Sequence, residues 1–226
     1  MEVGSSLSLM PEATPLYQIR LAVRRELSDL TAGDAVIVAT SGGADSLALA
    51  AAVLLESQTR SINPIAAIID HGLQPNSADV AQAAKNELSK IGYSAIEIRK
   101  VAVDVKDGME ASARRARYAA LDEIARSHNA AAIFLGHTKD DQAETVLLGL
   151  ARGSGTRSLS GMAQRIDNYR RPLLSITRAQ TEAACEEAGI KFWRDPHNQS
   201  MERSEEHTSE LQSHLNLVCR LLLEKK

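Results

Sequence analysis

The stretch from Ala35 to Ser46, AVIVATSGGADS, decides the fold. Its first five residues, AVIVA, form a short apolar run of the kind expected of a strand that is buried on both faces. A pair of glycines follows almost at once, and the residues from Ala44 to Ser57 have the length of a helix. A strand, a glycine-rich turn and a helix in direct succession predict the start of a parallel α/β sheet, with the turn at the strand's carboxyl end.

Three further apolar runs repeat this pattern downstream. They are IAAII at 65–69, SAIEI at 94–98 and AAIFL at 131–135, with helix-length stretches between them at 77–91 and 109–128. Because strands and helices alternate and crossovers are right-handed, the sequence predicts an α/β, doubly wound, mostly parallel sheet of about five strands with helices on both faces. Apolar residues at steps of three and four predict a leading amphipathic helix within residues 1–33.

Length and composition are those of an ordinary globular protein. The chain has 226 residues, of which 44% are hydrophobic and 24% charged, which suits one substantial domain plus an appendage. No apolar run approaches the roughly 20 residues that a membrane helix needs, and Met1 to Pro15 lacks the pattern of a secretory signal. We therefore expect a cytoplasmic location and no membrane partner.

The sequence changes character near Arg203. From there RSEEHTSELQSHLNLVCRLLLEKK continues none of the preceding pattern and resembles translated cloning or adapter sequence. We expect the main domain to occupy residues 34–202, and we interpret residues 203–226 as a non-native tail.

The turn after the first strand has the features of an anion site. It comprises Ser41, Gly42, Gly43, Ala44, Asp45 and Ser46. Glycines let the backbone approach a ligand closely, and the amides at a helix start point toward it. The common GxxxxGK[ST] loop is absent, so we expect a Mg²⁺ held by Asp45 to neutralise phosphate charge. The alternative is a structural turn in which Asp45 and Ser46 only stabilise the helix start.

Two more polar motifs follow predicted strands. DHG starts at Asp70, and GHTKDD starts at Gly136. Because the carboxyl ends of parallel strands meet at one edge of a sheet, we expect both motifs to line the same crevice as the glycine turn. Histidines at such strand ends are more often bonded to the backbone than catalytic, so we interpret His71 and His137 as residues that line this crevice.

The helix expected after Thr138 carries two acids on one face. Asp141 and Glu144 are three residues apart, and a pair of acids at a crevice can hold magnesium or receive a cationic amine. The alternative makes Asp141 a capping partner of Thr138 and Glu144 a solvated helix residue. The position beside the glycine turn favours the first interpretation.

In order and spacing these motifs resemble the tRNA(Ile) lysidine synthetases, within the superfamily of N-type ATP pyrophosphatases that share a PP-loop. The motifs are SGGADS at 41–46, DHGL at 70–73, EASARRARY at 110–118, GHTKDDQAET at 136–145, RGSG at 152–155, RPLL at 171–174 and WRDPHN at 193–198. The resemblance implies an adenine nucleotide alpha hydrolase-like fold, with residues 34–202 as the PP-loop ATP pyrophosphatase domain. It also implies ligation of lysine to C2 of the wobble cytidine through an adenylated cytidine, with release of AMP and pyrophosphate.

The resemblance further implies the partners and the residues of the site. The implied partners are ATP, Mg²⁺, free lysine and tRNA(Ile) with a CAU anticodon. The catalytic set implied is Asp45, Arg117, Asp141 and Glu144, with Asp45 and Asp141 as magnesium ligands. ATP would contact Ser41, Gly42, Gly43, Ala44, Asp45, Ser46, Asp70, His71, Gly136 and His137. tRNA would contact Arg114, Arg152, Arg157 and Arg171.

A basic stretch supports the expectation of a polyanionic partner. Between Thr145 and Arg178 there are six arginines and one acid, Asp167, and we expect the arginines to meet phosphates of the anticodon stem. Arg114 and Arg117 have a plainer alternative, which is that they form exposed pairs one helical turn apart with Glu110.

Other functions stay open at this point. A tRNA thiolase of the same superfamily would normally carry a CxxC motif, whereas the only cysteines are Cys185 and Cys219. Another adenylating PP-loop enzyme and a non-catalytic ATP-binding module are further alternatives. A homodimer is compatible with the sequence.

Overall fold

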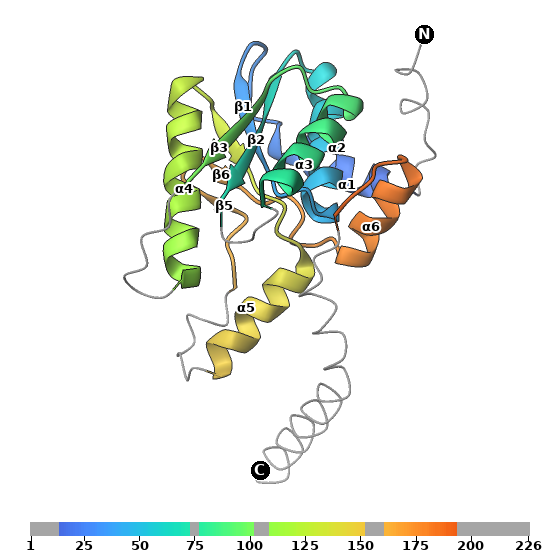
Figure 1. Cartoon of the computed structure of the whole chain (residues 1–226). Helices are drawn as coiled ribbons and strands as arrows, with labels where there is room; N and C mark the ends of the chain where they lie inside the picture. Colours follow the sequence, from blue (N-terminus) through green and yellow to red (C-terminus); the bar gives the residue numbers. More distant parts are fainter. Residues whose placement is uncertain (1–13, 73–76, 102–108, 152–160, 194–226) are drawn as a thin grey trace. The chain divides into compact units, whose positions relative to one another are not determined.

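The computed structural model describes residues 14–72, 77–101, 109–151 and 161–193 (Figure 1). Its elements are α1 (Pro15–Glu26), β1 (Ala35–Thr40), α2 (Ala44–Gln58), β2 (Asn63–Asp70), α3 (Ser77–Ile91), β3 (Ile96–Lys100), α4 (Met109–Ser127), β4 (Ala132–Phe134), α5 (Lys139–Ala151), β5 (Arg165–Ile166), β6 (Tyr169–Arg170) and α6 (Arg178–Glu187). Residues 152–160 and 194–226 lie outside the described part, and with them Arg152, Arg157, most of WRDPHN and the tail predicted at 203–226.

One sheet of six strands forms the centre of the fold. The strand order is β3-β2-β1-β4-β6-β5, and every neighbouring pair is parallel except β5 with β6. The prediction of a doubly wound, mostly parallel sheet is confirmed, and so are the four strands expected from apolar runs. The β5–β6 hairpin raises the number of strands from about five to six.

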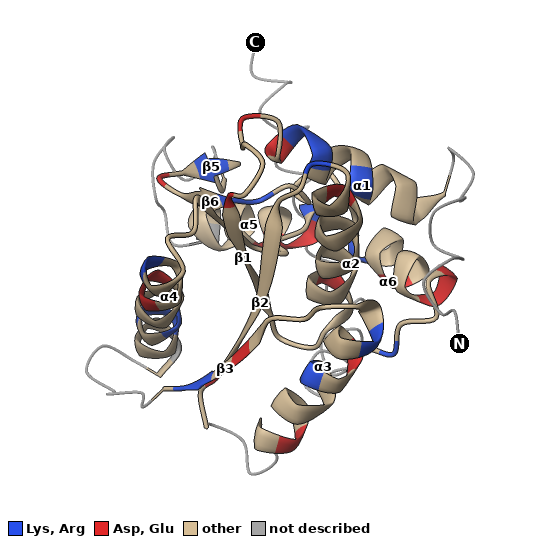
Figure 2. Ribbon diagram, turned by 90° about the horizontal axis from the view of Figure 1, so that it is seen from above, with Lys and Arg blue, Asp and Glu red and all other residues tan. Residues whose placement is uncertain are grey.

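Helices cover both faces of the sheet, as predicted (Figure 2). Successive residues of β1 alternate between two apolar clusters, because side chains of a strand point to opposite faces. Val36 and Val38 pack with α1, α2, α3 and α6, whereas Ile37 and Ala39 pack with Leu121 and other residues of α4. In the described segments, no helix combines the length and the apolar character that crossing a bilayer requires.

Helix α1 joins the first of these clusters through the apolar face that its periodicity predicts. Leu16, Ile19, Val23 and Leu27 are fully buried there. The helix begins after Thr14, whose hydroxyl accepts a hydrogen bond from the amide of Tyr17. It ends at Glu26, earlier than the end near Gly33 that the sequence suggests, because the chain turns through Leu27 into β1.

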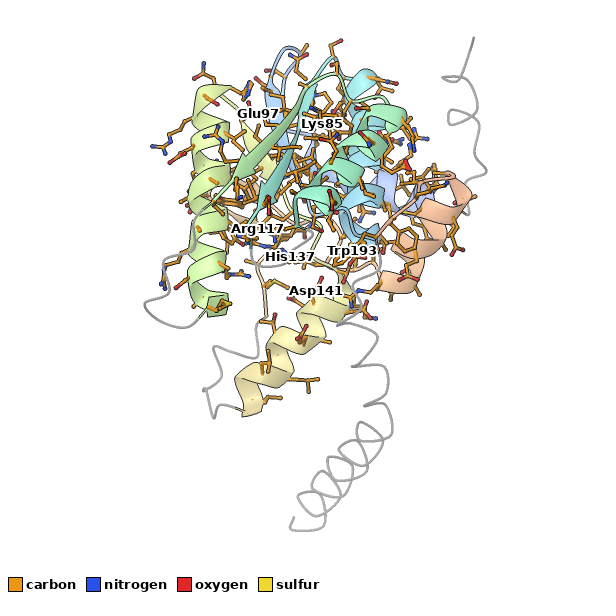
Figure 3. All side chains as sticks on the ribbon, viewed as in Figure 1. Lys85, Glu97, Arg117, His137, Asp141 and Trp193 are labelled. Carbon is orange, nitrogen blue, oxygen red and sulfur yellow. The ribbon has the colours of Figure 1, made fainter. Side chains whose placement is uncertain are left out.

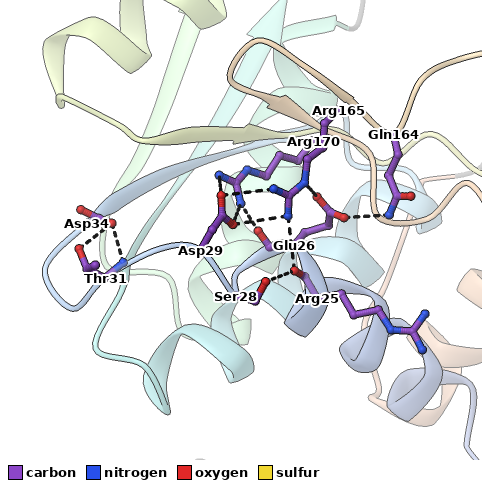
Figure 4. A network of polar contacts seen from close by, with 9 residues as sticks. All are labelled: Arg25, Glu26, Ser28, Asp29, Thr31, Asp34, Gln164, Arg165 and Arg170. Carbon is purple, nitrogen blue, oxygen red and sulfur yellow. Dashed lines mark hydrogen bonds and ion pairs between the residues drawn. The ribbon is translucent and has the colours of Figure 1, made fainter.

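A polar network ties the end of α1 to the β5–β6 hairpin (Figure 4). The buried Arg170 guanidinium donates to the Glu26 carbonyl and to both carboxylate oxygens of Asp29, at 2.6 and 3.0 Å. Arg165 donates to the Glu26 carboxylate at 2.6 Å, and Gln164 donates to its other oxygen at 2.8 Å. Arg170 is the main reason why the pKa of Asp29 lies below its ordinary value. The hairpin is therefore held by charge-assisted bonds rather than by its two short strands.

Candidate functional site

The glycine turn lies at the carboxyl end of β1, between the ends of β2 and β4. Gly42 has a φ of +89°, a conformation that side chains rarely adopt, and a Cβ placed there would come within 3.1 Å of the Ala84 Cβ in α3. Gly43 is the N-cap of α2, and no side chain caps that helix. Ser46 donates to the Gly43 carbonyl at 2.9 Å and accepts from the amide of Ser41 at 3.1 Å. The turn is thus fixed while the first amides of α2 stay free for an anion.

The motif after β4 approaches this turn closely. A Cβ on Gly136 would lie 3.2 Å from the backbone of Asp45 and Ser46, so only glycine allows this approach without a shift of the backbone. Figure 3 shows Arg117, His137, Asp141 and Trp193 gathered at the end of the sheet that faces α5. The expectation that the motifs after β1, β2 and β4 meet at one edge is therefore confirmed by the strand order.

Asp45 stands in the first turn of α2 and is partly buried. Its Oδ1 accepts a hydrogen bond from the Thr181 hydroxyl, and its Oδ2 lies 3.4 Å from Arg178 Nε. Burial raises the pKa of Asp45 above its ordinary value, although Thr181 and Arg178 oppose the shift. A carboxylate in this position is therefore stabilised by any cation that reaches it.

Asp141 stands in the first turn of α5 and is bound on both carboxylate oxygens. Its Oδ2 accepts from the amide of Thr138 at 2.7 Å and from the Thr138 hydroxyl at 2.9 Å. Its Oδ1 accepts from Arg178 Nη2 at 3.1 Å. The capping alternative is therefore present, but it uses only one oxygen and leaves the other facing the site. Glu144, which the sequence places on the same face, is exposed.

Arg178 and Thr181 of α6 are site residues that the sequence reasoning did not assign. Arg178 is the first residue of the helix, and its side chain contacts both Asp45 and Asp141. A capping box of Thr177 and Gln180 starts the helix at this point. The TxxQ spacing could have revealed the helix start, but only the packing of α6 on α2 reveals that Arg178 and Thr181 reach Asp45.

The acids at this edge suit a magnesium ion that shares its ligands with a phosphate. No group of three or more His, Cys, Asp or Glu residues in the described ranges is arranged to hold a metal. Mg²⁺ in nucleotide sites commonly takes one or two carboxylates, with waters and substrate phosphates completing its shell. Asp45 and Asp141 each direct one oxygen toward the Arg178 side chain, Asp45 at its Nε and Asp141 at its Nη2. The two carboxylates therefore fit the ion that the sequence predicts.

A second group of site residues is basic, and Asp70 and Asp141 are the acids whose charges act on its two histidines. Burial is the main cause that lowers the pKa values of Arg117, His71 and His137, the last to about 4. The positive charge of Arg117 lowers both histidine values further, and that of Arg171 also lowers the value of His137. Among the described residues no carboxylate pairs with Arg117, and His71 Nδ1, His137 Nδ1 and Arg171 Nε are buried without a partner. Such a pocket attracts an anion.

The lowered pKa of His137 predicts a pH dependence of stability. The unfolded chain takes up a proton on His137 near pH 6.5, whereas the folded protein resists protonation down to about pH 4. Because the unfolded state binds more protons in this window, stability falls as the pH falls from 6.5 to 4, by up to roughly 1.4 kcal/mol per pH unit. His137→Gln is expected to flatten the profile, as measured by urea denaturation at intervals between pH 7 and pH 4. Parallel profiles for the two proteins would contradict this assignment.

Several predicted contact residues occupy different environments. Arg117 is largely buried, so the alternative of an exposed helical pair is wrong for it. Arg114 is exposed and lies over the Tyr118 ring, 5.1 Å from its centre. Arg171 is buried and donates to the Ala163 carbonyl at 3.0 Å, so it offers no surface contact to a tRNA phosphate in this conformation. Asp70 is buried and accepts from the Gly72 amide at 2.9 Å.

Three arginines in the described part of the stretch from Arg152 to Arg178 are paired with acids. Arg165 and Arg170 are paired with acids near the end of α1, and Arg178 is paired with the acids of the site. Each of these three guanidiniums already has a carboxylate partner, and their contact with phosphates of the anticodon stem stays a prediction.

The backbones of Met162 and Trp193 form hydrogen bonds with residues near the site. Gln142, next to Asp141, accepts from the amide of Met162 at 2.6 Å and donates to its carbonyl at 3.2 Å. The amide of Trp193 donates to the Gly42 carbonyl at 2.9 Å. Met162 is thereby held against α5, and Trp193 is held against the glycine turn.

Curated proteins that share one name are similar to this chain. Curated relatives named tRNA(Ile)-lysidine synthase include that of Thermobifida fusca, 49% identical over 81% of this chain and 57% of its own length. Another is that of Streptomyces coelicolor, 50% identical over 72% of this chain and 47% of its own length. The chain thus spans about half the length of the curated relatives it matches.

Comparison with solved structures and with family models identifies the fold. A solved structure, the U34-tRNA thiolase NcsA from Methanococcus maripaludis with its [4Fe-4S] cluster, superposes with a TM-score of 0.68 at 19% identity. The superposition covers 80% of this chain and 66% of the thiolase chain, and the likeness concerns the fold alone. The family model described as PP-loop domain matches residues 17–205. The chain therefore belongs to the PP-loop domain family.

Proposed function

We propose that this chain carries the ATP-splitting part of a tRNA(Ile) lysidine synthetase. In the proposed reaction O2 of the wobble cytidine attacks the α-phosphate of ATP, and pyrophosphate leaves. The amine of lysine then attacks C2 of the base, the C2–O2 bond breaks, and AMP leaves with that oxygen. The observation that carries the proposal is the combination of an α2 N-terminus without a side-chain cap, two carboxylates that face one side chain, and a basic pocket with unpartnered buried nitrogens. Relatives 45–50% identical support the choice of tRNA and lysine.

The first displacement needs charge stabilisation rather than a protein nucleophile. The amides at the start of α2 and the residues Ser41–Ser46 would hold the departing pyrophosphate. Arg117 has no carboxylate partner among the described residues, so its guanidinium is available to the α-phosphate, where negative charge increases in the transition state. His71 and His137 would line the same pocket as neutral groups.

The second displacement needs a positioned lysine amine that has lost a proton. Asp141 and Glu144 would orient the incoming ammonium from the first turns of α5, and a carboxylate there can accept the proton. Mg²⁺, which Asp45 and Asp141 fit, would supply charge neutralisation for the triphosphate when bound.

Glu144 offers a test that separates lysine use from ATP cleavage. Glu144→Ala is expected to raise the KM for lysine by roughly tenfold or more, because a charge-assisted contact with the ammonium is lost. tRNA-dependent release of pyrophosphate should change much less. Glu123→Ala, which removes an exposed acid from α4, is the matched control and should leave both quantities unchanged. Equal losses in both would contradict a role specific to lysine.

The proposed function is tested by supplying ATP, Mg²⁺, lysine and tRNA(Ile) with a CAU anticodon. We expect AMP, pyrophosphate and a lysine-bearing cytidine, the last detected by mass spectrometry of tRNA digests. Transfer of sulfur to the tRNA would instead favour a thiolase, and ATP that binds without being cleaved would favour a non-catalytic module. Omitting tRNA serves as the control, because the attacking oxygen belongs to the base.

Contacts with tRNA are proposed for exposed arginines. Arg114 lies exposed on α4, one helical turn from Arg117, while Arg152 and Arg157 belong to a segment outside the described residues. Phosphate contacts of this kind place an RNA without reading its sequence, so binding should weaken as salt is added. The proposed reaction also implies the compartment that holds tRNA and ATP, the cytoplasm. A homodimer stays a prediction.

A further inference from the structure

The side chain of Arg178 contacts two carboxylates of the site, one through each of two nitrogens. Its Nε lies 3.4 Å from Asp45 Oδ2, and its Nη2 lies 3.1 Å from Asp141 Oδ1. The two acids come from different helices, α2 and α5, and Arg178 begins a third, α6. One cation therefore joins three elements at the edge of the sheet.

The other oxygen of each acid is held by the protein itself. Asp45 Oδ1 accepts from the hydroxyl of Thr181, and Asp141 Oδ2 accepts from the amide and hydroxyl of Thr138. Threonine donors of this type fix the orientation of a carboxylate, as do the groups that surround metal ligands. None of these contacts involves the Arg178 side chain, although the Thr181 hydroxyl is shared with the Arg178 carbonyl at 2.8 Å.

The contacts of Arg178 are ones that a ligand can exchange. Each acid receives a single nitrogen rather than the bidentate fork that makes arginine pairs strong. The side chain is 43% exposed, which limits the strength of an ion pair through solvent screening. Its backbone, by contrast, is anchored, because the Arg178 amide donates to Asp140 at 2.8 Å. The guanidinium can therefore move while the start of α6 stays in place.

We propose that Arg178 is a resident cation that occupies the metal position between Asp45 and Asp141 in the ligand-free protein, and that it moves to the pyrophosphate end of ATP when Mg²⁺ binds. This inference rests on the proposed function for the identity of the metal site. Arg178 keeps two acids from repelling each other before substrate arrives. It then contributes a positive charge to the leaving group, in a PP-loop that carries no lysine after its glycines.

The test measures two ligands whose affinities should change in opposite directions. Mn²⁺ alone serves as the metal probe, with free Mn²⁺ followed by electron paramagnetic resonance. Arg178→Gln is expected to bind Mn²⁺ more tightly, by roughly threefold to tenfold, because the competing guanidinium is gone. Inorganic pyrophosphate, added in the presence of a chelator, serves as the second probe. The same variant should bind it more weakly by a similar factor.

Pyrophosphate binding can be followed by the fluorescence of Trp193. This is the only tryptophan of the chain, and its amide is bonded to Gly42 of the anion turn. Arg178→Lys, which keeps the charge, should fall between wild type and Arg178→Gln for both ligands. Arg24→Gln is the matched control, since Arg24 is also 43% exposed and pairs with an acid of another helix, Glu56, away from the site. It should change neither affinity.

The opposite signs separate this role from a merely structural one. A variant with a damaged fold would lose affinity for both ligands, which would overturn the proposal. Unchanged or weaker Mn²⁺ binding by Arg178→Gln, including no detectable binding, would also overturn it, as would unchanged pyrophosphate binding. Asp45→Asn tests the assumption that Asp45 is a metal ligand, because this variant should no longer bind Mn²⁺. If AMP is never released from ATP and tRNA, the proposed function fails whatever Arg178 does.

Discussion

Asp45→Asn is expected to abolish tRNA-dependent release of AMP and pyrophosphate while the fold stays intact. The asparagine keeps the size of the side chain and an oxygen that can accept from Thr181, but it removes the charge that holds a cation beside the phosphates. Loss of one such electrostatic contact lowers turnover on the order of a hundredfold to a thousandfold. Initial rates of pyrophosphate release under saturating ATP and tRNA measure the effect.

Stability should respond differently to the same substitution. Burial raises the pKa of Asp45, which means that the folded protein gains little from ionising this group. The free energy of unfolding should therefore equal or exceed that of wild type. Asp79→Asn, which changes an exposed first-turn acid of α3, is the control and should keep full activity. Normal pyrophosphate release by Asp45→Asn would refute the assignment.

Arg117→Met is expected to give a more stable protein that no longer cleaves ATP. Arg117 is a buried cation with no acid partner in the described part of the chain, and such a charge costs stability until an anion arrives. An apolar side chain of similar length should raise the free energy of unfolding by about 1–2 kcal/mol. The same change should lower tRNA-dependent AMP release on the order of a hundredfold, because the transition-state charge loses its partner.

Chemical denaturation and AMP release on one protein preparation measure both effects. Arg126→Met is the matched control, because Arg126 belongs to the same helix but is exposed. It should change neither quantity by a measurable amount. A destabilised Arg117→Met would show that the guanidinium is structural. Retained activity would exclude a contact with the α-phosphate.

The main sheet could be predicted because a short apolar run marks each of its first four strands. The run at 65–69 corresponds to β2 and the helix at 77–91 to α3, with bounds that agree closely. Hairpin β5–β6 gave no such signal, since each strand has two residues and the contacts that hold it come from Arg165 and Arg170. Periodicity is visible only over several residues, and an ion pair between residues far apart in the chain leaves no such pattern.

The edge of the site was predictable for a topological reason. Motifs that follow β1, β2 and β4 must meet if these strands are neighbours in a parallel sheet, and they are. The position of Arg178 was not predictable, because it depends on how α6 packs against α2. In the sequence the arginines form one basic stretch. The partners of Arg165 and Arg170 lie 136 to 144 residues earlier in the chain, so the stretch itself does not reveal these pairs.

That separation has a consequence for synthesis on the ribosome. Glu26 and Asp29 are made early, but the arginines that neutralise them appear about 140 residues later. At a rate of roughly 5–20 residues per second, the wait lasts about 7 to 30 seconds. During this interval the apolar face of α1 can pack against α2, while the two acids at the end of α1 stay hydrated. The β5–β6 hairpin can therefore pair with the end of α1 only after nearly the whole domain has been synthesised.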